Sequence, residues 1–108
     1  MNTNFIELTR DNLSSFITAP KLLVIFGSRT CKGCKQIKPM LREISGLLPM
    51  VYVDARTFPK SSMLYPRSIR YYPTIAYFEN GYYKGTLNSK TVFIDIEKII
   101  NNEDINFE

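Results

Sequence analysis

The chain has 108 residues, of which 44% are hydrophobic and 22% charged, and its formal net charge at pH 7 is +4. This is the composition of a single globular domain over residues 1–108, and it excludes an intrinsically disordered chain. The chain has no histidine, which excludes a Ser-His-Asp triad, a Cys-His pair and any metal site built on imidazole. The longest apolar run, at 22–26, is too short to cross a bilayer. The first residues lack the pattern of a signal peptide, so we expect a cytoplasmic protein without a membrane partner.

The first half of the chain has the pattern of a strand–helix–strand unit. Residues 4–8 are predicted to form a short strand, and Thr9 or Asp11 to cap a helix with an apolar face at 13–17. The apolar run at 22–26 is typical of a buried parallel strand, and apolar residues at helical spacing follow it over 37–48. A further strand at 50–54 completes a βαβ unit, which predicts parallel pairing with a right-handed crossover.

The second half contains a hairpin and a last helix. Residues 56–70 are predicted to be irregular, with one short helix around 61–65. Asn80-Gly81 lies between runs at 74–79 and 82–86, which predicts an antiparallel pair joined by a two-residue turn. Asn88 or Ser89 is expected to cap a helix with apolar residues over 92–100. The chain from residue 101 onward is polar and acidic, and we expect a frayed tail.

The only two cysteines, Cys31 and Cys34, lie where the buried strand leads into the following helix. At a helix start, Cys31 would face free backbone N–H groups and the positive end of the helix dipole, which lower a thiol's pKa. Nearby cations add positive charge: Arg29, Lys32, Lys35 and Lys38. The pattern favours thiol–disulfide exchange, in which Cys31 attacks a substrate disulfide and Cys34 resolves the mixed disulfide. Two alternatives stay open, namely inert core cysteines and a metal site completed by a second chain.

The order of elements with Cys-x-x-Cys at the head of the second helix resembles the thioredoxin family. Further matches are Pro39 after the cysteines, the Arg70-Tyr71-Tyr72-Pro73-Thr74 segment, the Phe78-Glu79-Asn80-Gly81 turn and Gly85. The resemblance implies an α/β thioredoxin fold: a central mixed sheet of four to five strands flanked by about four helices. It also implies a cis Tyr72–Pro73 bond. The implied site surrounds Cys31 and Cys34 with Thr30, Lys32, Gly33, Lys35 and Pro73, and places Tyr72, Thr74 and Gly85 in a substrate groove.

The sequence departs from the family pattern at several positions. Thr30 stands where a tryptophan is usual, and Lys32-Gly33 stands where Gly-Pro is usual. Ile25 and Met50 replace a buried aspartate and its lysine partner. Without that acid to accept a proton behind Cys34, water or the Cys31 thiolate must help to deprotonate it, and we expect a slower resolving step and longer-lived mixed disulfides than with the aspartate. The segment 54–73 is four residues longer than is usual for the family.

The resemblance implies a thiol–disulfide oxidoreductase, a protein disulfide reductase in electron transport and cell redox homeostasis. It implies no cofactor beyond the redox-active Cys31–Cys34 disulfide and no metal. The implied partners are disulfide-containing proteins and a reductase or other dithiol, with the chain a monomer. The alternatives are a glutaredoxin-like, glutathione-dependent reductase and a non-enzymatic partner-binding module. The net charge of +4 is modest and five of the ten acids lie at 95–108, so we expect acidic protein substrates rather than nucleic acid.

Overall fold

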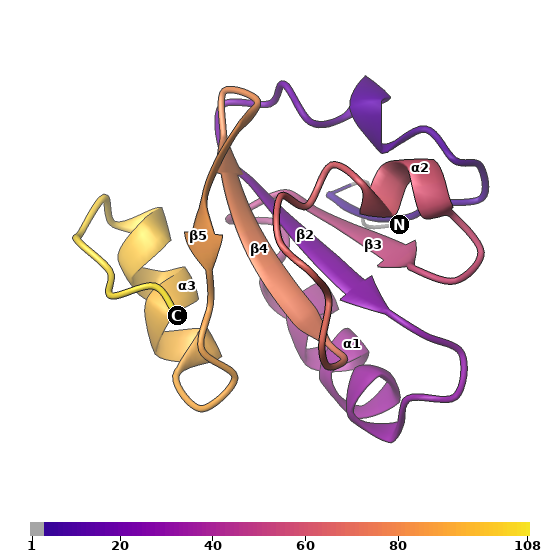
Figure 1. The fold of residues 1–108 in the computed structure, drawn as a ribbon. Helices are drawn as coiled ribbons and strands as arrows, with labels where there is room; N and C mark the ends of the chain where they lie inside the picture. Colours follow the sequence, from indigo (N-terminus) through magenta and orange to yellow (C-terminus); the bar gives the residue numbers. More distant parts are fainter. Residues whose placement is uncertain (1–3) are drawn as a thin grey trace.

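Five strands form one mixed sheet in the order β1-β3-β2-β4-β5 (Figure 1). The computed structural model describes residues 4–108. In chain order the elements are β1 (Phe5–Glu7), the 3-10 helix η1 (Leu13–Ser15), β2 (Leu22–Gly27), α1 (Lys32–Ile44), β3 (Met50–Asp54), α2 (Pro59–Ser62), β4 (Thr74–Glu79), β5 (Tyr82–Thr86) and α3 (Val92–Ile100). Strand β3 pairs in parallel with β1 and β2, and β4 pairs antiparallel with β2 and β5. The predicted α/β class and mixed sheet are confirmed, with three α-helices and one 3-10 helix among the described residues where about four helices were expected.

Strand β2 is apolar along its whole length because both of its faces are covered. Leu23 and Ile25 belong to the cluster beneath α1 and α3, whereas Val24 and Phe26 belong to the cluster on the other face, with Leu13 of η1. Figure 1 shows α1 and α3 on one side of the sheet and α2 with η1 on the other. Because successive side chains of a strand point to opposite faces, the apolar run at 22–26 supplies both clusters.

The hairpin between β4 and β5 has the predicted turn. Asn80 and Gly81 both have positive φ, 53° and 87°. Two successive positive φ values are what a type I′ turn needs, and asparagine and glycine adopt them at least cost. The predicted strand bounds, 74–79 and 82–86, are confirmed.

Three expectations about helix starts are wrong. The first helix is reduced to the 3-10 turn Leu13–Ser15, preceded by Asn12 rather than by a capping Thr9 or Asp11. Instead, the Asp11 carboxylate accepts hydrogen bonds from the backbone N–H groups of Lys60 and Ser61 at the start of α2, with N···O distances of 3.0 and 2.6 Å. Helix α2 therefore begins at Pro59, ahead of the expected 61–65, because its first turn is held by a residue 49 positions away along the chain.

The last helix also starts later than expected. It begins at Val92 after Thr91, and neither Asn88 nor Ser89 is its N-cap. The Thr91 hydroxyl instead donates to the carboxylate of Asp95 inside the first turn, 2.9 Å away. The stretch between β5 and α3 is consequently longer than the sequence indicates.

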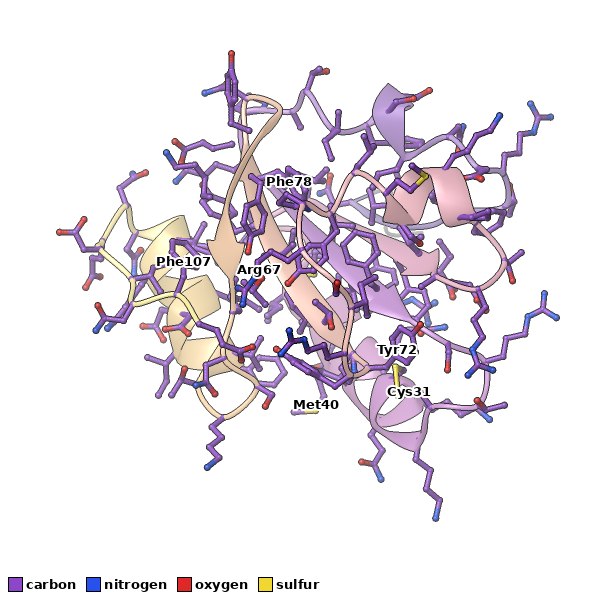
Figure 2. All side chains as sticks on the ribbon, viewed as in Figure 1. Cys31, Met40, Arg67, Tyr72, Phe78 and Phe107 are labelled. Atoms are coloured by element: carbon purple, nitrogen blue, oxygen red, sulfur yellow. A yellow bond between two sulfur atoms is a disulfide. The ribbon has the colours of Figure 1, made fainter. Side chains whose placement is uncertain are left out.

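The C-terminal segment is docked on the fold rather than frayed. Ile105 and Phe107 are half-buried and pack against the cluster beneath α1 and α3. Phe107 lies between α3 and β5 (Figure 2), where its ring stacks on that of Tyr77 at 6.3 Å between centroids. The Glu108 N–H donates to the carbonyl of Thr86 at 2.8 Å, which adds the tail to the edge of β5. Within residues 4–108, no helix has the length and apolar character that a membrane crossing requires.

Candidate active site

Cys31 is the N-cap of α1, at the end of a short connection from β2. Its Sγ atom accepts a hydrogen bond from the backbone N–H of Cys34 at 3.1 Å, and its own N–H donates to the carbonyl of Ser28. The sulfur thus takes the place of the oxygen that a serine or aspartate supplies at other helix starts. A negative charge on this atom is favoured by the free N–H groups and the positive end of the helix dipole.

The two cysteines differ in exposure. They are joined by a disulfide, with their Cα atoms 5.3 Å apart. Cys34 is 1% exposed and belongs to the cluster beneath α1 and α3, whereas Cys31 is only half-buried at its margin. A substrate disulfide can therefore approach the sulfur of Cys31, while the sulfur of Cys34 faces the protein interior.

The loop before β4 lies directly against the cysteine pair. The Tyr72–Pro73 peptide bond is cis. A Cβ atom on Gly33 would lie 3.6 Å from Cδ of Pro73 and 4.0 Å from Sγ of Cys31, so glycine leaves open the space between loop and sulfur. Figure 2 shows Tyr72 beside Cys31. The loop brings backbone next to the exposed sulfur, where an extended peptide can pair with it.

The other predicted site residues have different surroundings. Thr30 is exposed, with its hydroxyl 3.5 Å from that of Ser28. The buried side chain of Thr74 donates to the carbonyl of Tyr71 at 2.6 Å, and so it holds the loop rather than facing solvent. Gly85 is buried too, and a Cβ atom on it would overlap the ring of Phe107. The tail thus covers that side of Gly85.

Two of the cations that the sequence places around the thiols are paired with carboxylates, which reduces the positive field there. The Nζ atom of Lys38 lies 2.6 Å from the Glu7 carboxylate, and Nε of Arg29 lies 3.6 Å from that of Asp54. Lys32 and Lys35 are exposed to solvent. The two paired cations contribute less to a thiolate than the sequence suggests, and the helix dipole carries more of the effect.

The buried position behind Cys34 is apolar. Ile25 and Met50 are 0% and 1% exposed, and both belong to the same cluster as Cys34. Both members of the charged pair that the resemblance implies are apolar here, so neither position leaves a buried charge without a partner. Among residues 4–108, no group of three or more Cys, Asp or Glu side chains is placed to hold a metal ion.

A cavity of about 540 Å³ lies beside the site, and its lining adds residues, Tyr52 among them, that the sequence did not single out. It is bounded by the ends of β1, β2 and β3 and by the first turns of α1; its lining residues are Glu7, Leu8, Thr9, Ser28, Arg29, Lys35, Lys38, Tyr52, Asp54, Thr57 and Phe58. Tyr52 connects this cavity to Cys34 by way of Gly27, because a Cβ atom on Gly27 would overlap the Tyr52 hydroxyl and lie 3.0 Å from Cys34 Sγ. The continuous apolar run of β3 marks Tyr52 as buried, but only the pairing of β2 with β3 places its hydroxyl.

A disulfide-forming pair with one accessible and one buried sulfur, at the head of a helix that follows the central strand of this fold, defines a thiol–disulfide oxidoreductase. The family model described as thioredoxin matches residues 4–102. The chain therefore belongs to the thioredoxin family.

Solved structures show the same relationship. The thioredoxin of Schistosoma mansoni is 26% identical and superposes with a TM-score of 0.72, covering 91% of this chain and 94% of that one. The thioredoxin of Plasmodium falciparum is also 26% identical, with a TM-score of 0.72 and coverage of 86% and 97%. A thioredoxin h from poplar shares the fold at 22% identity, with a TM-score of 0.75 and coverage of 91% and 97%. No curated protein matches the chain. The comparisons do not favour the glutaredoxin-like or the binding-module alternative.

Proposed function

We propose that the protein reduces disulfide bonds of protein substrates, with Cys31 as the nucleophile and Cys34 as the resolving thiol. This assignment of roles rests on the difference in solvent exposure between Cys31 and Cys34. The half-buried Cys31 sulfur lies at the helix start with a backbone N–H directed at it, and Cys34 is enclosed. A nucleophile for a large substrate must be reachable, whereas a resolving thiol needs to reach only its neighbour.

The exchange proceeds in two steps. The Cys31 thiolate attacks one sulfur of the substrate disulfide, and the other substrate sulfur leaves as a thiolate and takes up a proton. Cys34 then loses its proton and attacks Sγ of Cys31, which releases the second substrate thiol and forms the Cys31–Cys34 disulfide. Two electrons pass from the dithiol to the substrate. A partner reductase or another dithiol regenerates the reduced form, and no bound cofactor takes part.

The surrounding residues support binding of an extended substrate segment. The backbone of Tyr72, at the cis bond to Pro73, pairs with the substrate strand next to Cys31, with Thr74 fixing the loop. The open space at Gly33 admits the substrate chain. The exposed Lys32 and Lys35, with Thr30, favour substrates that carry acidic residues near the disulfide. Gly85, predicted for the groove, is buried under Phe107 on β5 and takes no part in it. We propose that the protein works as a monomer.

Substitution of each cysteine by serine tests the assignment of roles. Cys34→Ser is expected to accumulate a mixed disulfide between Cys31 and substrate, seen as a covalent adduct that dithiothreitol releases. Cys31→Ser is expected to lose insulin reduction and to form no adduct at Cys34. Adducts at Cys34 in the Cys31→Ser variant would reverse the roles. If a protein partner still bound to both variants, and the wild type did not reduce insulin, an enzymatic role would be contradicted.

A further inference from the structure

Tyr52 stands next to the resolving cysteine on the face of the sheet that packs against α1. It is opposite Ile25 in the parallel ladder between β2 and β3, and it is 7% exposed. It belongs to the same cluster as Cys34. A buried tyrosine needs a partner for its hydroxyl, and the two-step exchange between the cysteines uses none of the atoms of this side chain.

Gly27 makes the room for the Tyr52 hydroxyl. A Cβ atom at this position would overlap both Oη and Cζ of Tyr52, and the same atom would lie 3.0 Å from Sγ of Cys34. The phenolic oxygen and the sulfur therefore border one small space, which a side chain at position 27 would fill. The hydroxyl also reaches the wall of the 540 Å³ cavity, to which Ser28 and Asp54 contribute polar groups that water can bind.

The surroundings of Tyr52 keep its hydroxyl protonated. Burial raises the pKa of the Tyr52 phenol above its ordinary value, and the carboxylates of Asp54 and Glu7 add to that shift. The Nζ atom of Lys38 lies 4.2 Å from the centre of the ring and holds it in place by a cation–π contact. A neutral phenol is a hydrogen-bond donor, and a thiolate is an acceptor that gains more from such a bond than a neutral thiol does.

We propose that the Tyr52 hydroxyl stabilises the Cys34 thiolate by a hydrogen bond during the resolving step. The inference deepens the proposed function and depends on it. With substrate bound to Cys31, the Cys34 thiol gives its proton to water in the adjoining cavity, and the Tyr52 O–H donates to the resulting thiolate. The thiolate attacks Sγ of Cys31, the bond between Cys31 and substrate breaks, and the substrate sulfur leaves with the electron pair. Tyr52 thus offsets the loss of the acid that Ile25 replaces.

Charged groups on every side of this space also act on the Cys34 thiolate. Lys35 and Lys38 from α1, with Arg29 from the β2–α1 connection, favour it; Glu7 from β1 and Asp54 from β3 oppose it. Because the carboxylates pair with Lys38 and Arg29, these four charges largely offset one another, which leaves the solvent-exposed and therefore screened Lys35. Because the Tyr52 hydroxyl is a neutral donor, it stabilises the thiolate without changing the sum of these charges.

The test compares Tyr52→Phe with Tyr77→Phe, which removes another buried hydroxyl whose partner is Glu79. In a Cys31→Ser background, the ultraviolet absorbance of the Cys34 thiolate is followed against pH, which needs no turnover. Tyr52→Phe is expected to raise the pKa of Cys34 by about one unit, a tenfold change in the proton equilibrium. Tyr77→Phe is expected to leave the pKa unchanged. Equal Cys34 pKa values in Cys31→Ser and in Cys31→Ser with Tyr52→Phe would overturn the inference whether or not the protein reduces disulfides.

A second readout follows the resolving step itself. A mixed disulfide between Cys31 and thionitrobenzoate is formed below neutral pH, and release of the coloured thiol is timed after a pH jump. Tyr52→Phe is expected to slow release about tenfold at neutral pH and to match the wild type at alkaline pH, where Cys34 is already ionised. Gly27→Ala, which fills the space of the hydroxyl, is expected to act in the same direction. Slowing by the same factor at every pH would mark a merely structural role and contradict the proposal; no release from the wild type would overturn the proposed function itself.

Discussion

The ring of Phe107 covers Gly85 of β5, on the side where any other residue would carry its Cβ atom. The same ring stacks on Tyr77, and the backbone N–H of Glu108 donates to Thr86. The tail therefore covers part of the exposed edge of β5 and completes one wall of the hydrophobic cluster. Edge strands covered in this way are less prone to pair with other chains.

Loss of the Phe107 ring is expected to destabilise the fold. Phe107→Ala is predicted to lower the free energy of unfolding by about 2 kcal/mol, below the value for a fully buried ring because the side chain is half-exposed. Urea denaturation measures the change, with the exposed Asn106→Ala as control. Gly85→Ala is expected to destabilise the wild type through overlap with the ring and to cost less in the Phe107→Ala background. Additive effects of the two substitutions would contradict the contact.

A single charge in the apolar cluster behind Cys34 is expected to destabilise the fold. Ile25→Asp is predicted to cost about 3–5 kcal/mol of unfolding free energy, because it buries a carboxylate without a partner. Addition of Met50→Lys in the same cluster is expected to recover part of that loss, and Ile25→Val is a control with an expected cost of about 1 kcal/mol. A stability of Ile25→Asp equal to that of the wild type, measured by urea denaturation at neutral pH, would show that water reaches this position.

The hairpin turn depends on glycine at position 81. Gly81→Ala is predicted to cost about 1 kcal/mol, because φ is 87° there and a Cβ atom disfavours that conformation. Gly46 offers a matched control: a Cβ on it would meet no atom within 4 Å. Gly46→Ala is expected to be neutral or slightly stabilising. Thermal unfolding of both variants measures the difference, and equal midpoints would argue against a type I′ turn.

The attachment of α2 to Asp11 is expected to weaken in acid. Partial desolvation raises the pKa of the Asp11 carboxyl, but hydrogen bonds from Ser61 and Lys60 outweigh it, so that the pKa lies below the usual 3.8. A depressed pKa means that Asp11 stabilises the fold at pH values above 3.8, and that this contribution disappears as the pH falls through the lowered pKa. Unfolding of wild type and Asp11→Ala is compared from neutral pH downward. The two stabilities should converge in acid, and a constant gap would contradict the assignment.

Local patterns explain which parts of this structure the sequence predicts. The apolar run at 22–26, the Cys-x-x-Cys spacing and the Asn80-Gly81 turn each determine their own geometry over a few residues, so strand, helix start and hairpin follow from the sequence. The βαβ rule predicts the parallel pairing of β2 with β3, and the turn predicts the antiparallel pairing of β4 with β5. The places of β1 beside β3 and of β4 beside β2 depend on distant segments, and the sequence did not predict them.

Features that depend on distant residues could not be predicted in this way. The pairing of Glu7 with Lys38, 31 residues apart, needs β1 to lie beside α1, and the capping of α2 by Asp11 overrides the local signal for the helix start. The tail at 101–108 has the composition of a frayed end, yet two of its apolar residues reach the core. Tyr52 has no motif at all, and its closeness to Cys34 depends on the absence of a side chain at Gly27.

In the proposed reaction, the Cys31–Cys34 pair passes two electrons to a protein disulfide. The most direct measurement mixes the fully reduced protein with excess insulin, quenches with acid, and determines the masses and alkylation states of both. We predict that each protein molecule loses about two hydrogens, forms the Cys31–Cys34 disulfide and opens one insulin disulfide. Insulin that stays oxidised while both cysteines remain free and alkylatable after unfolding would rule out this electron transfer.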